Sequence, residues 1–130
     1  MKRYLLDTHI VLWGLTAPRR LSPATRAILE NEAVHVSALS VWELLLKQRQ
    51  GRLRLPDSPL IAAIERAGAK LIPLLAEHAE SAAALGPMHG DPIDRLLVGT
   101  ARVEQMVLMT RDAELLERAA PVLGRLLLEA

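Results

Sequence analysis

The sequence predicts an α/β fold, specifically a three-layer α/β/α sandwich around a short, mainly parallel sheet of four or five strands. Short apolar runs alternate with longer segments that carry helix starts and stops. Strands that alternate with helices pair in parallel through crossover connections. The chain has 130 residues, 51% of them apolar, without a repeat or linker, so residues 1–130 are expected to form a single domain.

Four apolar runs are the expected strands, because each is short and lies between helix signals. They are RYLL (3–6), AVHV (33–36), KLIPL (70–74) and MVLM (106–109). The end of the chain is less defined. The segment PVLGRLLLEA (121–130) is divided by Gly124 and fits either a last edge strand or a short helix.

The expected helices have recognisable ends. Ser22 is a good N-cap with Pro23 at the first helical position, and Asp57 with Ser58 opens a later helix before Pro59. Glycine follows three helices, at Gly51, Gly68 and Gly86. The helices cover residues 10–15, 22–31, 39–50, 60–67, 76–85, 92–104 and 112–119.

Composition excludes several kinds of site. The chain has no cysteine, which removes disulfides, thiol catalysis and thiolate metal sites, and leaves oxygen or imidazole as metal ligands. No run approaches the roughly 20 apolar residues that span a bilayer, and no signal peptide is visible, so the cytoplasm is the expected compartment. A formal net charge of +1 is too small to indicate a nucleic-acid partner by itself.

Basic residues gather in one segment, KQRQGRLR (47–54), which contains Lys47, Arg49, Arg52 and Arg54 and no acid. Such a patch can hold phosphates by charge and by bidentate hydrogen bonds. It is equally typical of a solvated helix end, where the helix dipole favours cations. The sequence leaves both interpretations open.

Four acids are expected at one edge of the sheet, where the parallel strands end. Asp7 directly follows the first expected strand, and Asp112 follows the fourth after two residues. Asp94 lies in the first turn of a helix that begins at this edge, and Glu43 lies one turn into the helix after the second strand. Binding sites in such sheets lie beyond the carboxyl ends of the strands, so the coincidence predicts a functional site.

The aspartates also have ordinary structural explanations. Asp7, Asp91 and Asp112 can cap helices, and Asp94 faces the positive end of a helix dipole. Asp94, however, lies in line with the apolar stripe of its own helix, and a cap residue has no need to face inward. The common edge, rather than any single acid, favours a site.

Glu43 is the acid for which spacing alone favours the ordinary interpretation. It shares a polar stripe with Ser40, Lys47 and Gln50. Glu43 and Lys47 have the i, i+4 spacing of a favourable surface ion pair, worth a few tenths of a kcal/mol. Spacing therefore predicts a solvated helix face here.

Acids gathered at one edge need compensation for their repulsion. Ionised carboxylates within about 5 Å repel by roughly 3 kcal/mol per pair at an effective dielectric near 20, against a domain stability of about 5–15 kcal/mol. Raised pKa values or a divalent cation would relieve this repulsion. Oxygen ligands suit Mg²⁺ or Mn²⁺, which can activate water for attack on a phosphodiester. Thr8, Ser40 and Thr110 adjoin the acids and can hydrogen-bond to them.

The histidines do not support a zinc hydrolase. His9, His35, His78 and His89 have neither HxxxH nor HExxH spacing. His89 can face the site, but a structural or surface role is the more ordinary interpretation.

At the same acids the sequence resembles the PIN-domain ribonucleases, particularly the VapC-type toxins of bacterial toxin–antitoxin modules. The matching pieces are LLDTHIVLW (5–13), SALSVWELLLK (37–47), HGDPIDRLLVGTA (89–101) and LMTRD (108–112), in order and spacing over nearly the whole chain. The resemblance implies a Mg²⁺- or Mn²⁺-dependent endoribonuclease, often a homodimer, that is inhibited by a cognate antitoxin. The chain departs from the pattern at Ile93, where an aromatic residue is common, and at Gly99, where alanine is usual.

The resemblance also implies roles for individual residues. The catalytic acids and metal ligands are Asp7, Glu43, Asp94 and Asp112, with Asp91 of the same DPxD signature as a further ligand. Apart from the resemblance, the basic residues expected to position the RNA backbone are Arg95, Arg111, Lys47, Arg49 and Arg52. Because the chain has few aromatic residues, phosphate and shape contacts are favoured over base stacking.

Two other interpretations stay open. A phosphatase of the haloacid-dehalogenase type uses an aspartate after its first strand but expects another acid two residues on, where this chain has His9. A receiver-like or protein-binding module would keep the acid cluster without chemistry, although a receiver needs a late lysine and none follows Lys70. RNA cleavage is therefore the leading expectation.

Overall fold

The computed structural model describes residues 2–86 and 90–130 and has a five-stranded sheet at its centre, in the order β3-β2-β1-β4-β5. The strands are β1 (Arg3–Leu6), β2 (Ala33–Ser37), β3 (Lys70–Ile72), β4 (Val107–Thr110) and β5 (Leu127–Glu129). Every neighbouring pair is parallel. The predicted α/β class is confirmed, and the first strand of the chain lies in the middle of the sheet.

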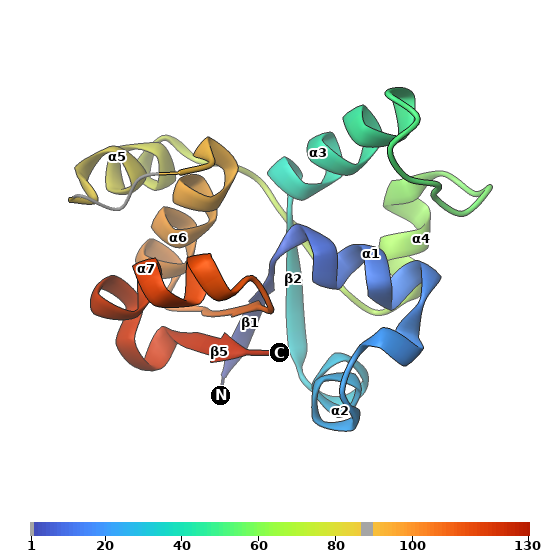
Figure 1. Cartoon of the computed structure of the whole chain (residues 1–130), viewed down its shortest axis with the longest axis horizontal. Helices are drawn as coiled ribbons and strands as arrows, with labels where there is room; N and C mark the ends of the chain where they lie inside the picture. The colour runs from blue at the N-terminus through green and yellow to red at the C-terminus, as the bar shows by residue number, and fades with distance from the viewer. Residues whose placement is uncertain (1, 87–89) are drawn as a thin grey trace.

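Helices cover both faces of the sheet (Figure 1). On one side lie α1 (Thr8–Thr16), α2 (Pro23–Asn31), α3 (Ala38–Arg49) and α4 (Leu60–Arg66), and on the other α5 (Ala76–Ala84), α6 (Pro92–Glu104) and α7 (Ala113–Leu123). Two short 3₁₀ helices, η1 (Pro18–Arg20) and η2 (Gly124–Leu126), follow α1 and α7. No helix in the described part of the chain is long and apolar enough to cross a membrane.

The central strands bury alternate residues on opposite faces, as the two-residue period of a strand requires. Tyr4 and Leu6 belong to the hydrophobic cluster beneath α1–α4, whereas Leu5 belongs to the cluster beneath α5–α7. In β4, Leu108 joins the second cluster, and its neighbours on either side join the first. Both faces of the sheet are therefore covered by apolar packing, which makes the predicted three layers.

Proline is involved in two of the differences from the expected elements. Strand β3 ends at Ile72, two residues earlier than expected, because Pro73 has no N–H for the sheet ladder. Helix α4 has Pro59 as its N-cap residue and no side-chain cap, so Asp57 and Ser58 do not open it as expected.

The C-terminal segment contains both structures that the sequence left open. Helix α7 continues past Ala119 and through Pro121 to Leu123, whose side chain is buried. Gly124 has a φ of +53°, a conformation that glycine adopts without strain, and the chain turns there toward the sheet. Strand β5 then pairs in parallel with β4 at the edge.

Helices α5 and α6 approach closely because Gly99 has no side chain. A Cβ atom at this position would lie 2.7 Å from the backbone nitrogen of Ala82 and 2.7 Å from the carbonyl oxygen of His78. Both distances are far inside normal van der Waals contact. The glycine that departs from the family pattern therefore holds α6, which carries Asp94 in its first turn, against α5.

Gly99→Ala is expected to destabilise the protein by about 1–3 kcal/mol, because the two helix backbones must separate to admit the methyl group. This loss outweighs the gain of about 0.5–1 kcal/mol that alanine brings to a helix interior. Gly14→Ala in α1 is the matched control, since its Cβ would lie 3.6 Å from Leu29 Cδ1, an ordinary contact. Urea unfolding compares the two variants, and equal free energies of unfolding would contradict the close packing at Gly99.

Candidate functional site

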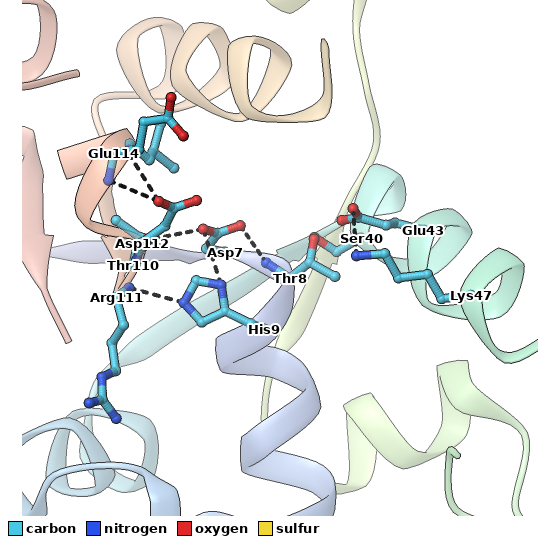
Figure 2. A network of polar contacts seen from close by, with 11 residues as sticks. Asp7, Thr8, His9, Ser40, Glu43, Lys47, Thr110, Arg111, Asp112 and Glu114 are labelled. Atoms are coloured by element: carbon cyan, nitrogen blue, oxygen red, sulfur yellow. Dashed lines mark hydrogen bonds and ion pairs between the residues drawn. The ribbon is translucent and has the colours of Figure 1, made fainter. Parts of the chain in front are cut away.

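Asp7 lies at the carboxyl end of the central strand and is held at both carboxylate oxygens (Figure 2). The residue is only 5% exposed. Oδ1 accepts a hydrogen bond from the Thr8 backbone N–H at 2.7 Å, and Oδ2 accepts one from the Thr110 hydroxyl at 2.7 Å. The register that pairs Leu6 with Met109 brings Thr110 beside Asp7. The side chain therefore has one fixed orientation.

The environment of Asp7 opposes its negative charge. Burial is the largest influence on the pKa of Asp7 and raises it above its usual value. The neighbouring His9 and the hydrogen bonds from Thr110 and Thr8 lower the pKa in part, whereas the charge of Glu43 raises it. A positive charge placed near Asp7 would therefore be stabilising.

Thr110 also connects Asp112 with Asp7. Its hydroxyl oxygen accepts the Asp112 backbone N–H at 3.0 Å, while the hydroxyl proton is donated to Asp7. Asp112 Oδ1 caps α7 by accepting the N–H groups of Glu114 at 2.9 Å and Leu115 at 3.3 Å. Asp112 is therefore a helix cap, as the ordinary interpretation predicts, and it is also part of the network around Asp7.

Asp94 approaches the same place from the α5–α7 layer. Its side chain is half-buried and has no hydrogen bond or ion pair to any residue within 2–86 or 90–130. Burial raises the pKa of Asp94 to about 7, together with the negative charges of Asp7, Asp91, Asp112 and Glu43. The acids predicted at this edge therefore lie close enough together to raise the pKa of the Asp94 carboxyl group.

The interpretation of the Glu43 stripe as a solvated face is wrong for Ser40 and Glu43, whereas the predicted ion pair between Glu43 and Lys47 is confirmed. Ser40 is 0% exposed, and its hydroxyl shares a 2.9 Å hydrogen bond with the Thr8 hydroxyl. The Glu43 side chain is 15% exposed and pairs with Lys47 at 3.2 Å. Helix α1 covers this part of α3, and spacing within α3 cannot reveal a neighbour that comes from elsewhere in the chain.

His9 is a site residue that sequence reasoning missed. Its Nε2 accepts the backbone N–H of Arg111 at 3.0 Å, so the neutral ring carries its proton on Nδ1. Nδ1 lies 3.4 Å from Asp7 Oδ2. The available signal was its place two residues after Asp7, at the start of a helix that begins at the sheet edge.

A cavity of about 200 Å³ opens beside the acids. Its lining residues are Gly90, Asp91, Asp94, Asp112, Glu114, Leu115 and Arg118. Asp91 caps α6 by accepting the Ile93 N–H at 2.7 Å. Glu114, a second residue that sequence reasoning missed, pairs with Arg118 at 2.6 Å. A larger cavity of about 430 Å³ lies along α1 and α2, but its lining is mainly apolar and holds none of these acids.

The donor atoms suit a hard divalent cation, although they are not gathered tightly. Asp7, Asp94 and Asp112 offer carboxylate oxygens, the ligands that Mg²⁺ and Mn²⁺ prefer. In the described ranges, no three acidic or histidine side chains lie close enough to hold one ion as they stand. The close cluster assumed from the sequence is therefore not present in this arrangement. To hold one cation together, the carboxylates would have to move closer, and within the described ranges no hydrogen bond restrains Asp94.

Two of the basic residues suggested for RNA contact have protein partners. Lys47 is paired with Glu43. Arg95 donates from Nη2 to the carbonyl oxygens of Ala82 and Leu85, each at 2.9 Å. Arg95 thus satisfies carbonyls at the end of α5, a structural role that the sequence did not indicate. Contact of either residue with RNA stays a prediction.

The other basic residues occupy two different places. Arg49 and Arg52 are exposed at the far end of α3. Along the helix axis, Arg49 lies about 14 Å from Ser40, the residue that contacts Thr8. Arg111 is exposed and directly precedes Asp112, and its side chain extends past His9, away from the acids (Figure 2). Of these residues, Arg111 lies nearest to the site.

His35 and His78, the other histidines that the structure describes, have no place in this network. His78 is buried, accepts the Leu75 N–H at Nδ1 and lies 2.8 Å from Glu104 through Nε2, which is a structural contact. His35 lies in β2 beside the carbonyl of Tyr4. His89, which was suggested to face the site, lies outside the described residues.

Comparisons with known proteins agree with the architecture. The PIN domain family model matches residues 4–121. Ribonuclease VapC22 of Mycobacterium tuberculosis is 31% identical over 125 residues, which covers 93% of this chain and 95% of that protein. Among solved structures, VapBC2 from Rickettsia felis bound to a DNA fragment from its promoter has a TM-score of 0.65 and 17% identity, covering 98% of each chain. A toxin–antitoxin complex from Klebsiella pneumoniae has a TM-score of 0.64 and 15% identity, covering 96% of this chain and 95% of that chain.

The contribution of Asp94 to the stability of the protein in EDTA is expected to fall as pH rises from about 4 to about 7. The pKa of Asp94 is about 7 in the folded state against a usual value of 3.8, so the folded state binds more protons in this window and ionisation favours unfolding. The raised pKa of Asp7 acts in the same direction. In Asp94→Asn, the fall in the free energy of unfolding over this pH range is expected to be smaller than in the wild type. The difference is about 1–2 kcal/mol, because Asp94 is only half-buried and solvent screens its charge.

Urea unfolding at the two ends of this pH window measures the effect. Asp57→Asn is the matched control, because Asp57 is an exposed carboxylate outside the site and its removal should leave the pH dependence unchanged. An Asp94→Asn variant with the wild-type pH dependence would show that Asp94 is not the group responsible.

Proposed function

The chain belongs to the PIN-domain family, and from this premise we propose that it is an endoribonuclease, the toxin of a toxin–antitoxin module. One observation carries the proposal. A buried aspartate at the carboxyl end of the central strand is surrounded by further carboxylates, in a chain that is 31% identical over nearly its whole length to a ribonuclease. No observation favours the haloacid-dehalogenase alternative or a module without chemistry.

The proposed catalytic set is Asp7, Glu43, Asp94 and Asp112. Thr110 supports it, because its hydroxyl fixes Asp7 and accepts the Asp112 N–H. The roles of Thr8 and Ser40 are to join α1 to α3, through the hydrogen bond between their hydroxyls, so that Glu43 stays near Asp7. These contacts hold the carboxylates of separate elements at one edge before substrate binds.

The proposed cofactor is Mg²⁺ or Mn²⁺, held by the four catalytic acids with Asp91 as a further ligand. When bound, such an ion supplies a water of lowered pKa and offsets negative charge on the phosphodiester. The chain contributes the fixed orientation of Asp7 and an Asp94 carboxyl whose pKa of about 7 lets it release its proton near neutral pH. Asp91 keeps its capping bond through Oδ1 and offers the other oxygen.

The proposed substrate is RNA, bound mainly through its phosphates in the cytoplasm. Arg111 directly precedes Asp112 and is the proposed main contact with phosphate, and Arg95, Lys47, Arg49 and Arg52 are assigned weaker contacts. With only two tryptophans, one tyrosine and no phenylalanine, the chain has few surfaces on which bases could stack. Charge and shape are therefore the proposed basis of binding.

A cognate antitoxin and a second copy of the chain are the proposed partners. Support for the antitoxin comes from the similar folds seen in toxin–antitoxin complexes. Trp42 and Leu45 of α3 and Ile61 of α4 are large apolar side chains exposed to solvent. Exposed apolar groups of this size are typical of surfaces that bind another protein.

Purified protein is expected to cleave total RNA when Mg²⁺ or Mn²⁺ is added and to be inactive in EDTA. Asp7→Asn and Asp94→Asn should each lower the cleavage rate by about 100-fold or more, because each removes a charge that stabilises the reacting centre. Asp57→Asn is the control and should cleave normally. Gel analysis of RNA fragments provides the measurement, with circular dichroism to establish that every variant is folded. Hydrolysis of p-nitrophenyl phosphate without RNA cleavage would contradict the proposal.

Titration with Mn²⁺ is expected to show binding at millimolar concentrations or below, which isothermal calorimetry can detect without any substrate. Asp94→Asn should weaken this binding by about 10-fold or more, because one anionic ligand is lost. Asp57→Asn should bind as the wild type does. If the wild type takes up no Mn²⁺ at millimolar concentrations, the proposed cofactor is wrong.

A further inference from the structure

A cluster of cations lies against Trp13, next to the acid site. The guanidinium carbon of Arg20, in η1, lies 4.2 Å from the centre of the Trp13 ring, and that of Arg111 lies 5.4 Å from the same ring. Arg111 Nη1 also donates a hydrogen bond to the carbonyl oxygen of Arg20 at 2.7 Å. We refer to Trp13, Arg20 and Arg111 as the Arg–Trp platform.

The positive charge of the platform is not neutralised by the protein. Within residues 2–86 and 90–130, neither Arg20 nor Arg111 forms an ion pair with a carboxylate. Both side chains belong to exposed residues. Each guanidinium has five N–H donors, and the bond to the Arg20 carbonyl uses only one of those on Arg111. Two like charges beside one ring repel each other, and an anion bound between them would offset that repulsion.

A series of short contacts connects the platform with the acids. The His9 ring meets the Trp13 ring edge-on, with centroids 5.1 Å apart. The same His9 accepts the Arg111 backbone N–H at 3.0 Å and lies 3.4 Å from the Asp7 carboxylate. Figure 2 shows His9 between Asp7 and Arg111, with the Arg111 side chain extending away from the acids. His9 therefore lies between the acids and the platform, so the two arginines are next to the acid site.

We propose that the Arg–Trp platform binds a backbone phosphate of RNA that neighbours the phosphodiester cleaved at the acids. This inference rests on the proposed ribonuclease function and adds a substrate subsite to it. An RNA strand that crosses a cluster of carboxylates needs cations beside that cluster, because the carboxylates repel its phosphates. The platform supplies two cations, Arg20 in η1 and Arg111 directly after β4, and both lie against Trp13.

The geometry favours a phosphate over a base. Arg20 lies over the Trp13 ring, so a base could stack there only by displacing it. A guanidinium held against an aromatic ring keeps its planar N–H fork in a fixed orientation, which suits bidentate bonds to phosphate oxygens. The stacking restricts the arginine side chains before RNA arrives, so less conformational entropy is lost on binding.

Binding of a short single-stranded RNA in EDTA tests the platform apart from cleavage. Fluorescence anisotropy gives the affinity of the wild type, Arg20→Gln, Arg111→Gln and a matched control, Arg19→Gln, which removes the same charge from an exposed neighbour in η1. Each platform variant should bind RNA about 3- to 10-fold more weakly, with a salt dependence reduced by about 0.7 per lost phosphate contact. Arg19→Gln should keep the wild-type affinity and salt dependence.

Two further measurements separate phosphate binding from a loss of structure. In a Trp42→Phe background, Trp13 is the sole tryptophan, and its fluorescence should change when RNA binds. Replacing single phosphates of the RNA by neutral methylphosphonates should identify one position that weakens wild-type binding but has no further effect in Arg20→Gln. Arg111→Lys keeps the positive charge but lacks the planar guanidinium that can form bidentate hydrogen bonds. It is the second variant to compare with the wild type if Arg111→Gln folds poorly.

The outcomes distinguish the subsite from the enzyme. If the platform variants bind RNA as Arg19→Gln does, or no methylphosphonate position depends on Arg20, the subsite is wrong, while metal-dependent cleavage by the same preparation would still support the ribonuclease. If RNA binds through the platform but is not cleaved with Mg²⁺ or Mn²⁺, the proposed function fails and the phosphate subsite stands. Absence of RNA binding by the wild type would overturn the subsite.

Discussion

The site depends on one buried negative charge, the Asp7 carboxylate at the end of the central strand. The backbone N–H of Asp7 bonds to the Met109 carbonyl at 2.9 Å, and the side chain accepts hydrogen bonds from Thr8 and Thr110. A buried carboxylate would be costly without such partners, so α1, β1 and β4 must meet in this register. The same contacts lead outward to Asp112 and His9. The positions of Thr110, Asp112 and His9 are therefore tied to that of Asp7.

Much of the fold could be predicted because its signals are local. Ser22 accepts the Thr25 N–H, as its place before Pro23 predicts, and apolar runs bounded by helices are parallel strands. The errors occur where local signals compete with packing. Helix α7 passes through Pro121 because burial of Leu123 favours one more turn, and that benefit depends on contacts from distant parts of the chain. The last strand was ambiguous for the same reason.

The acids could be predicted from topology, whereas their surroundings could not. The rule that parallel strands end at one edge was enough to select Asp7, Asp94 and Asp112. It could not show that Asp94 has no hydrogen-bond partner among residues 2–86 and 90–130, or that Ser40 is buried against α1, because both depend on contacts between helices. The choice between a helix cap and a place in the site was also not exclusive. Asp112 caps α7 with one carboxylate oxygen, and its backbone N–H belongs to the network around Asp7, so a residue that starts a helix can also lie in the site.

The strand order has a consequence for how the molecule folds. Strand β1 lies at the centre of the sheet, between β2, which follows it closely in sequence, and β4, which lies far along the chain. Thr110 is hydrogen-bonded to Asp7 although the two residues are 103 positions apart in the sequence. Contacts of this kind close a long loop and form slowly, because the entropy of loop closure is lost before the contact is gained. A partly folded chain in which β4 has not yet joined β1 therefore lacks the arrangement of Asp7, Thr110 and Asp112.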